Sequence, residues 1–212
     1  MTERGAGVRE LALAIRLVLA GVLVGSHFVT DSPYVYPHYV LIILLHPPFL
    51  RRAFDVRLRP WQTVYVSIPV FLHPMGGLFG WYSTVWWFDH LTHTASATLV
   101  ASIGFTLARA HASRSADASS RVHRWFVPAF TIAFVMAAGF VWEVVETYTP
   151  LLSVYGPNDT FWDYVFDFVG GLVVLALGDR LLPEPAEQLA GRLDELDVDL
   201  PLPGTVESER SR

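Results

Sequence analysis

Three aspartates recur at a spacing of four residues near the start of one long apolar segment. Asp159, Asp163 and Asp167 lie in or just before residues 161–182, which are otherwise apolar enough to cross a membrane as a helix. On a helix, residues four apart stay near one face, with a drift of about 40° per step. A carboxylate at the centre of a bilayer costs about 2.5–3.5 kcal/mol on insertion scales, so such acids normally face a bundle interior or a wet cavity. The segment therefore predicts a helix whose acidic face is covered by other helices.

The negative charge of these acids needs a partner, and the apolar segments around them supply no basic side chain. Residues 62–108 and 126–178 contain neither arginine nor lysine. Cysteine is absent from the whole chain, which excludes disulfides and thiolate metal sites. Histidine, a proton and a metal cation therefore remain as the groups that can neutralise the acids.

The composition is typical of a membrane protein rather than of a soluble one. Hydrophobic residues make up 52% of the 212 residues, and the mean hydropathy is +0.38. We therefore expect an all-α fold, a polytopic membrane bundle of six transmembrane helices within residues 1–183. The expected spans are residues 11–29, 35–50, 61–81, 88–110, 125–147 and 161–182.

The arginines predict how this bundle is oriented, because basic residues near span ends stay on the cytoplasmic side. Residues 51–59 and 109–124 contain four arginines each. The loops expected on the opposite side, residues 30–35, 82–88 and 148–160, contain none. With both termini cytoplasmic, six spans place fourteen of the fifteen arginines inside, whereas five spans would put the arginines of 51–59 outside. The sequence thus predicts a multi-pass protein with cytoplasmic N and C termini.

The C-terminal residues 184–212 have a different composition, with eight acids and three arginines. Leu189, Leu193 and Leu196 share one helical face, which indicates a short amphipathic helix. The rest of this segment is polar and contains proline, so we expect an acidic cytoplasmic tail that is largely disordered.

Acids and imidazoles gather where three of the expected spans begin or end. Asp89 and His93 lie four residues apart at the start of the fourth span, with His90 on the flank. Glu143 and Glu146 are neighbours near the end of the fifth span. The aspartates of the sixth span complete the set, and the expected topology puts all of these residues at a similar depth on the outer side.

Such pairs on adjacent helices are how helical bundles build metal sites. The excess of carboxylates favours a divalent metal such as Zn, Mg, Mn or Fe. The expected metal ligands are Asp89, His93, Glu143 and Asp163. Glu146 or Asp159 is expected to act as the catalytic general base, or as a carboxylate that orients a ligand. The corresponding activity is hydrolysis or group transfer on a lipid-linked substrate.

Other interpretations of the same residues stay open. Asp89 and Asp159 lie at helix starts, where a carboxylate can simply cap the helix, and Asp167 can be a hydrogen-bonded structural acid. The acids can also carry protons or a cation in a transporter, or connect helices in a membrane protein without catalytic activity. Whether the protein is an enzyme is therefore undecided at this level. The basic loops are explained by topology and by contact with anionic membrane lipids, and no nucleic-acid partner is expected.

Three motifs in this order resemble the YjdF-type inner-membrane proteins, a prokaryotic family of small six-span proteins without an assigned activity. The motifs are Trp-Phe-Asp89-His-Leu-Thr-His93, Trp-Glu143-Val-Val-Glu146 and Asp159-Thr-Phe-Trp-Asp163, within residues 60–180. The resemblance implies a location in the cytoplasmic membrane of a prokaryote and a shared role for the acids and His93 of these motifs. His90 and Asp167 fall outside the pattern.

Overall fold

The computed structural model describes residues 57–114, 121–148 and 157–195, together with isolated positions between residues 10 and 52. All elements of this described part are helices: α4 (Pro60–Phe79), α5 (Trp81–Thr84), α6 (Phe88–Arg114), α7 (Arg121–Tyr148), α8 (Pro157–Leu181) and α9 (Pro183–Glu195). The expected all-α class is confirmed for these residues. Apart from the isolated positions, the first two expected spans and the tail beyond residue 195 lie outside the described residues.

Three of the helices are long and apolar enough to cross a membrane. They cover residues Phe88–Arg114, Arg124–Tyr148 and Asn158–Leu181, which match the expected spans at 88–110, 125–147 and 161–182. Helix α4 forms where the third span was expected, but it is not among these candidates. The structure therefore shows a helical protein with three candidate membrane-spanning helices in its described part.

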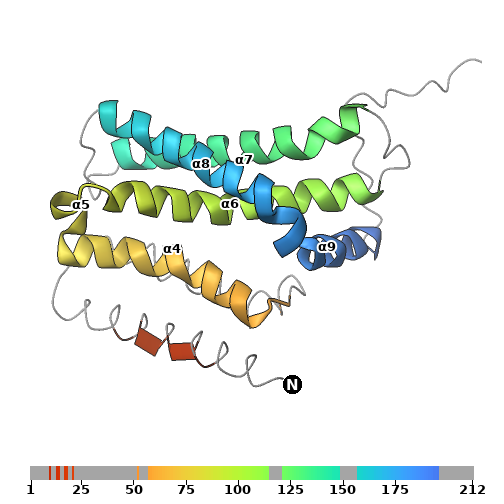
Figure 1. The fold of residues 1–212 in the computed structure, drawn as a ribbon, viewed down its shortest axis with the longest axis horizontal. Coiled ribbons are helices and arrows are strands. Elements are labelled where there is room, and N and C mark those ends of the chain that lie inside the picture. The colour runs from red at the N-terminus through yellow and green to blue at the C-terminus, as the bar shows by residue number, and fades with distance from the viewer. Residues whose placement is uncertain are drawn as a thin grey trace, which may run out of the picture.

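Helix α6 lies at the centre of the bundle and contacts α4, α7, α8 and α9 (Figure 1). In the most apolar 18-residue stretch of α6, 50% of the residues are buried, against 17% in that of α7. The outer face of α7 carries exposed apolar side chains such as Phe140 and Val141. The outer face of α8 also carries exposed apolar side chains, among them Phe168 and Leu172. Exposed large apolar side chains are stable against lipid but unfavourable in water, so these outward faces are typical of a membrane protein.

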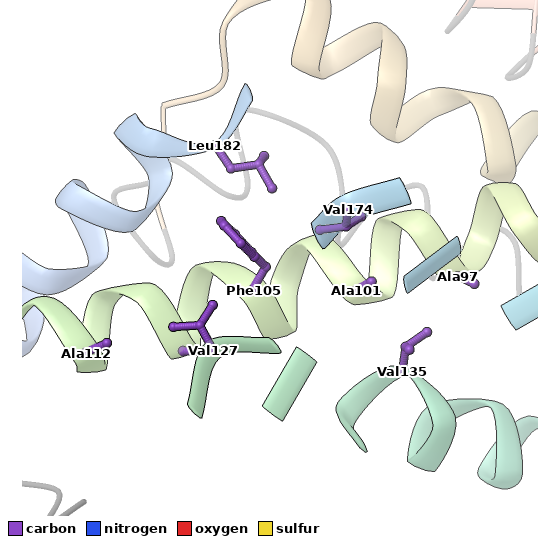
Figure 2. Packing of buried hydrophobic residues seen from close by; sticks show 9 residues of the cluster. Ala97, Ala101, Phe105, Ala112, Val127, Val135, Val174 and Leu182 are labelled. Atoms are coloured by element: carbon purple, nitrogen blue, oxygen red, sulfur yellow. The ribbon is translucent and has the colours of Figure 1, made fainter. Parts of the chain in front are cut away.

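Small residues on α6 and α8 bring these two helices close together. Figure 2 shows Ala97 and Ala101 of α6 in the core beside Val174 of α8 and Val135 of α7. A Cβ added to Gly170 of α8 would lie 2.6 Å from the Ala97 Cβ, and 2.9 Å from the backbone of α6. The glycine is therefore required for this close approach, because small residues let the backbones of two helices come near each other.

The two ends of the bundle differ in charge. At the end where α6 finishes, α9 packs against α6 (Figure 1). Ion pairs join Arg59 to Glu184 and Arg114 to Asp194 at this end. Helix α9 (Pro183–Glu195) forms where the amphipathic helix was predicted and contains Leu189 and Leu193, whereas Leu196 lies outside the described residues. At the opposite end, Gly80 has a φ of 65° and ends α4, so that the short helix α5 turns the chain back towards the start of α6.

Candidate metal centre

His93 lies at the centre of the polar cluster, one turn into α6 and buried to 6% exposure. Its Nδ1 lies 3.3 Å from Asp167 Oδ1, within hydrogen-bond distance. Its Nε2 lies 3.4 Å from Asp163 Oδ1 and 3.8 Å from Asp89 Oδ1. Both ring nitrogens of one imidazole thus face carboxylate oxygens.

Helix α8 supplies two of these carboxylates because Asp163 and Asp167 are four residues apart and share the face that packs on α6. Gly139 of α7 makes room for the second one, since a Cβ added there would overlap Asp167 Oδ2. Asp163 and Asp167 are 2% and 7% exposed, so both lie inside the bundle. The acidic face expected for this helix is therefore covered by α6 and α7.

Two sets of side chains could hold a metal ion, and Asp163 belongs to both. His93, Glu143 and Asp163 are all buried, and each offers one ligand atom within 4.8 Å of the others. Asp89 and His90 form the second set with Asp163, within the same limit. The structure thus brings His93, Glu143 and Asp163 together from three helices.

Two buried atoms of the cluster have no hydrogen-bond partner within the described residues: Asp163 Oδ1 and His90 Nδ1. Buried polar atoms are nearly always hydrogen-bonded, and a buried carboxylate needs a cation or a proton beside it. The Asp163 oxygen instead lies 3.4 Å from His93 Nε2, close enough for an ion pair but without a hydrogen bond between the two atoms. This arrangement fits a divalent ion placed between the two atoms.

Asp167 is the residue whose role the sequence analysis left unassigned. When its carboxylate accepts a hydrogen bond from Nδ1–H of His93, the lone pair of the neutral imidazole is on Nε2, towards Asp163 and Asp89. A carboxylate that holds a histidine in this way is typical of metal-binding histidines. The four-residue spacing after Asp163 was the signal in the sequence.

Glu146 and Asp159, the expected catalytic acids, lie beside the cluster rather than in it. Glu146 is half-buried on α7 and interacts electrostatically with His93, Glu143 and Asp89. Asp159 is half-buried in the first turn of α8, and its charge acts on Asp163. Neither belongs to the two ligand sets.

A family of membrane proteins, described as "Predicted membrane protein (DUF2238)", matches residues 11–184 of this chain. The chain belongs to this family. The resemblance to the YjdF-type proteins is thereby confirmed, and so is the assignment as a membrane protein. No curated protein and no solved structure matches the chain. The DUF2238 match extends over α4 to α8 and so includes the entire cluster.

In this DUF2238 protein, a second hydrogen-bonded group borders the cluster, and sequence reasoning missed it. The Tyr82 hydroxyl lies 2.7 Å from His73 Nδ1, and His73 Nε2 lies 3.1 Å from Ser96 Oγ. Burial raises the pKa of the Tyr82 phenol above its ordinary value, so the hydroxyl keeps its proton. Tyr82 also interacts electrostatically with Asp89. His73, Tyr82 and Ser96 come from the three helices α4, α5 and α6, so no regular spacing within one segment of the sequence predicted that they would meet.

Proposed function

We propose that this membrane protein binds a divalent metal ion between α6, α7 and α8, with His93, Glu143 and Asp163 as ligands. The observation that supports this most directly is the buried Asp163 carboxylate, whose Oδ1 has no hydrogen-bond partner in the described part of the chain and lies 3.4 Å from His93 Nε2. A cation between two such atoms removes the unpaired negative charge and uses the imidazole lone pair.

Each residue of the centre then has a separate task. Asp167 accepts the Nδ1–H hydrogen bond and keeps the Nε2 lone pair of His93 directed at the ion. Glu143 supplies a buried carboxylate from α7, and Asp163 supplies one from α8. Asp89 lies 3.8 Å from the same Nε2 and completes the ring of acids around it. Zn, Mg, Mn and Fe all accept such oxygen and nitrogen ligands.

The chemistry that suits this arrangement is hydrolysis or group transfer on a lipid-linked substrate. When bound, a divalent ion polarises a phosphoryl or carbonyl oxygen and stabilises the charge that develops there. Glu146 is half-buried next to the ligands and can take a proton from the attacking nucleophile, and Asp159 is the second candidate for that task. A substrate with a lipid anchor fits because the cluster lies at the ends of helices whose outer faces are apolar.

The proposal also places the cluster on the outer side of a prokaryotic cytoplasmic membrane. The protein then has six spans, with both termini in the cytoplasm. The support is the separation of charge along the bundle. In the described residues, Arg59, Arg109 and Arg114 form ion pairs near the end of the bundle that carries α9. The Asp/Glu/His cluster lies near the opposite end, which carries α5, and Figure 1 shows α9 and α5 at these two ends. Arginine-rich ends stay in the cytoplasm, so the cluster faces outward.

A transporter that moves protons or a cation is the second candidate, and the hydroxyls between α4 and α6 favour it. The Tyr65 hydroxyl lies 3.2 Å from Ser102 Oγ, further along α6 than the cluster. A relay across the membrane needs titratable groups, however, and residues 94–108, 125–142 and 168–178 contain no Asp, Glu, His, Lys or Arg. The distribution of charge in α6, α7 and α8 therefore favours a one-sided site.

Metal content tests the proposal directly. The full chain, purified in detergent, should carry at least one equivalent of divalent metal by mass spectrometry. A Glu143→Gln, Asp163→Asn double variant should lose it. Asp179→Asn is the matched control, because Asp179 is an exposed acid of α8 paired with Arg109 at the far end, so its metal content should stay that of the wild type. Wild-type protein that stays metal-free after incubation with Zn²⁺ or Mn²⁺ would overturn the proposal.

A further inference from the structure

We infer that the centre is binuclear, with the Asp163 carboxylate bridging two divalent ions. The first ion is the one described above, and the second is held by Asp89 and His90 together with Asp163. This inference rests on the proposed function, because it adds a second ion to the same cluster.

The geometry of the two ligand sets is the first argument. Each set gathers three side chains whose ligand atoms lie within 4.8 Å of one another, and Asp163 is the single residue that the sets share. Metal–ligand bonds are about 2.0–2.2 Å long, so an ion among the atoms of a set would draw them closer together. A carboxylate has two oxygens and can therefore bind one ion with each. Two-metal centres of this kind hold their ions about 3.5–4 Å apart, and helical bundles build them from bridging acids and flanking histidines.

Unpaired buried atoms are the second argument, and one of them belongs to His90. Its Nδ1 is buried without a hydrogen-bond partner in the region that the structure describes, like Oδ1 of Asp163. The His90 ring is stacked on Phe166 of α8, with centroids 4.3 Å apart and an angle of 13° between the planes. Trp162 lies against the same imidazole, with centroids 6.2 Å apart. The aromatic contacts hold the imidazole in place, and a metal ion would give its nitrogen a partner.

Charge balance is the third argument. Six carboxyl groups lie in or beside the cluster that contains the two imidazoles: Asp89, Glu143, Glu146, Asp159, Asp163 and Asp167. Residues 62–108 and 126–178 hold no arginine or lysine. If the acids are ionised, one divalent ion leaves a net charge of about −4 in a largely buried cluster, and two ions leave about −2. The second ion therefore removes most of the remaining repulsion.

Manganese loading of the full chain tests this inference. Protein in detergent is stripped with chelator, reloaded with Mn²⁺, and examined for Mn content and for its electron paramagnetic resonance spectrum. We expect two Mn²⁺ per chain and the spectrum of a spin-coupled pair. His90→Gln, which keeps a planar polar side chain, should retain one Mn²⁺ with the six-line spectrum of an isolated ion. His111→Gln is the matched control, because His111 lies on the same helix at the far end.

The possible outcomes separate this inference from the proposed function. One Mn²⁺ per wild-type chain with an isolated-ion spectrum would overturn the binuclear centre and leave the single-metal proposal intact. No bound Mn²⁺, Zn²⁺ or Mg²⁺ would overturn both. A coupled pair that persists in His90→Gln would remove His90 from the second set and so contradict the inference.

Discussion

His93 is held by carboxylates on both sides of its ring, and this arrangement sets different tasks for chemically similar residues. Asp167 faces Nδ1 at 3.3 Å, and Asp163 faces Nε2 at 3.4 Å. In the proposed centre, the first aspartate orients the imidazole and the second binds the ion. The two acids are both buried and differ by one helical turn, so their tasks follow from the nitrogen that each one faces.

Substitution of Asp167 tests its orienting task. Asp167→Asn keeps the size of the side chain but removes the charge that fixes the Nδ1–H of His93. We expect metal affinity to fall about 10–100-fold, the usual effect of losing such a partner. Competition with a fluorescent Zn²⁺ chelator measures this change, with Asp179→Asn as the control. An affinity within twofold of the wild type would show that Asp167 has no part in metal binding.

Glu143 distinguishes a metal ion from protonated acids as the source of charge compensation. If a metal is bound, Glu143→Gln removes a ligand and leaves the remaining acids to repel one another, so the melting temperature should fall. Chelator should then destabilise the wild type by about 5–10 °C, because saturation at 100 times the Kd contributes about 2.7 kcal/mol. The variant should respond little to chelator.

Protonated acids give the opposite pattern, since glutamine is nearly isosteric with a neutral glutamic acid. A wild type indifferent to chelator, together with a Glu143→Gln variant that melts no lower, would contradict the metal centre. Thermal melts of both proteins, each with and without chelator, make the comparison.

Helix packing decides whether these side chains can meet, and α6 and α8 approach each other closely at Gly170. Gly170 faces the α6 backbone at Thr94 and Thr98, where an added Cβ would lie 2.9 Å from each. Asp163 is about two turns earlier on the same helix, so a displacement of α8 there would also move this acid away from His93. Gly170 therefore affects the polar cluster indirectly, because it sets how closely α8 packs on α6.

A single added methyl group tests this link. Gly170→Ala should lower stability by about 1–3 kcal/mol, because it overfills a packed interface, and it should reduce metal content. Gly77→Ala on α4 is the matched control, since nothing lies within 4 Å of its added Cβ. Thermal melts and metal analysis of the two variants should therefore differ. Equal behaviour would show that the close approach of α8 to α6 is not needed.

The polarity of the entire bundle follows from where its charges lie. Figure 1 shows α9 and α5 at opposite ends of the described bundle. Ion pairs involving Arg59, Arg109 and Arg114 are at the α9 end, and the acid and histidine cluster is at the α5 end. A bundle with such an asymmetry is expected to insert with the arginines in the cytoplasm.

The absence of native cysteine makes this orientation easy to measure. Single-cysteine variants Ser115→Cys and Ser153→Cys are treated with a membrane-impermeant maleimide on intact cells. We expect labelling of position 153 in intact cells, and of position 115 only after permeabilisation. The reverse pattern would place the cluster on the cytoplasmic side.

The sequence by itself determined the properties that depend on local chemistry. Hydropathy over about twenty residues predicted α6, α7 and α8, and the four-residue spacing put Asp163 and Asp167 on one face. The motif order also indicated the family. These features are readable because helix periodicity and membrane partitioning act within a single segment.

Only the tertiary structure decided which side chain meets which. His93 and Asp167 are 74 residues apart, and their contact depends on how closely α8 packs on α6 at Gly170. The periodicity of a helix defines its polar face but not the rotation or depth of the neighbour that covers it. For the same reason, the stacking of His90 on Phe166 and the contact of α9 with α6 emerged from the packing of the bundle.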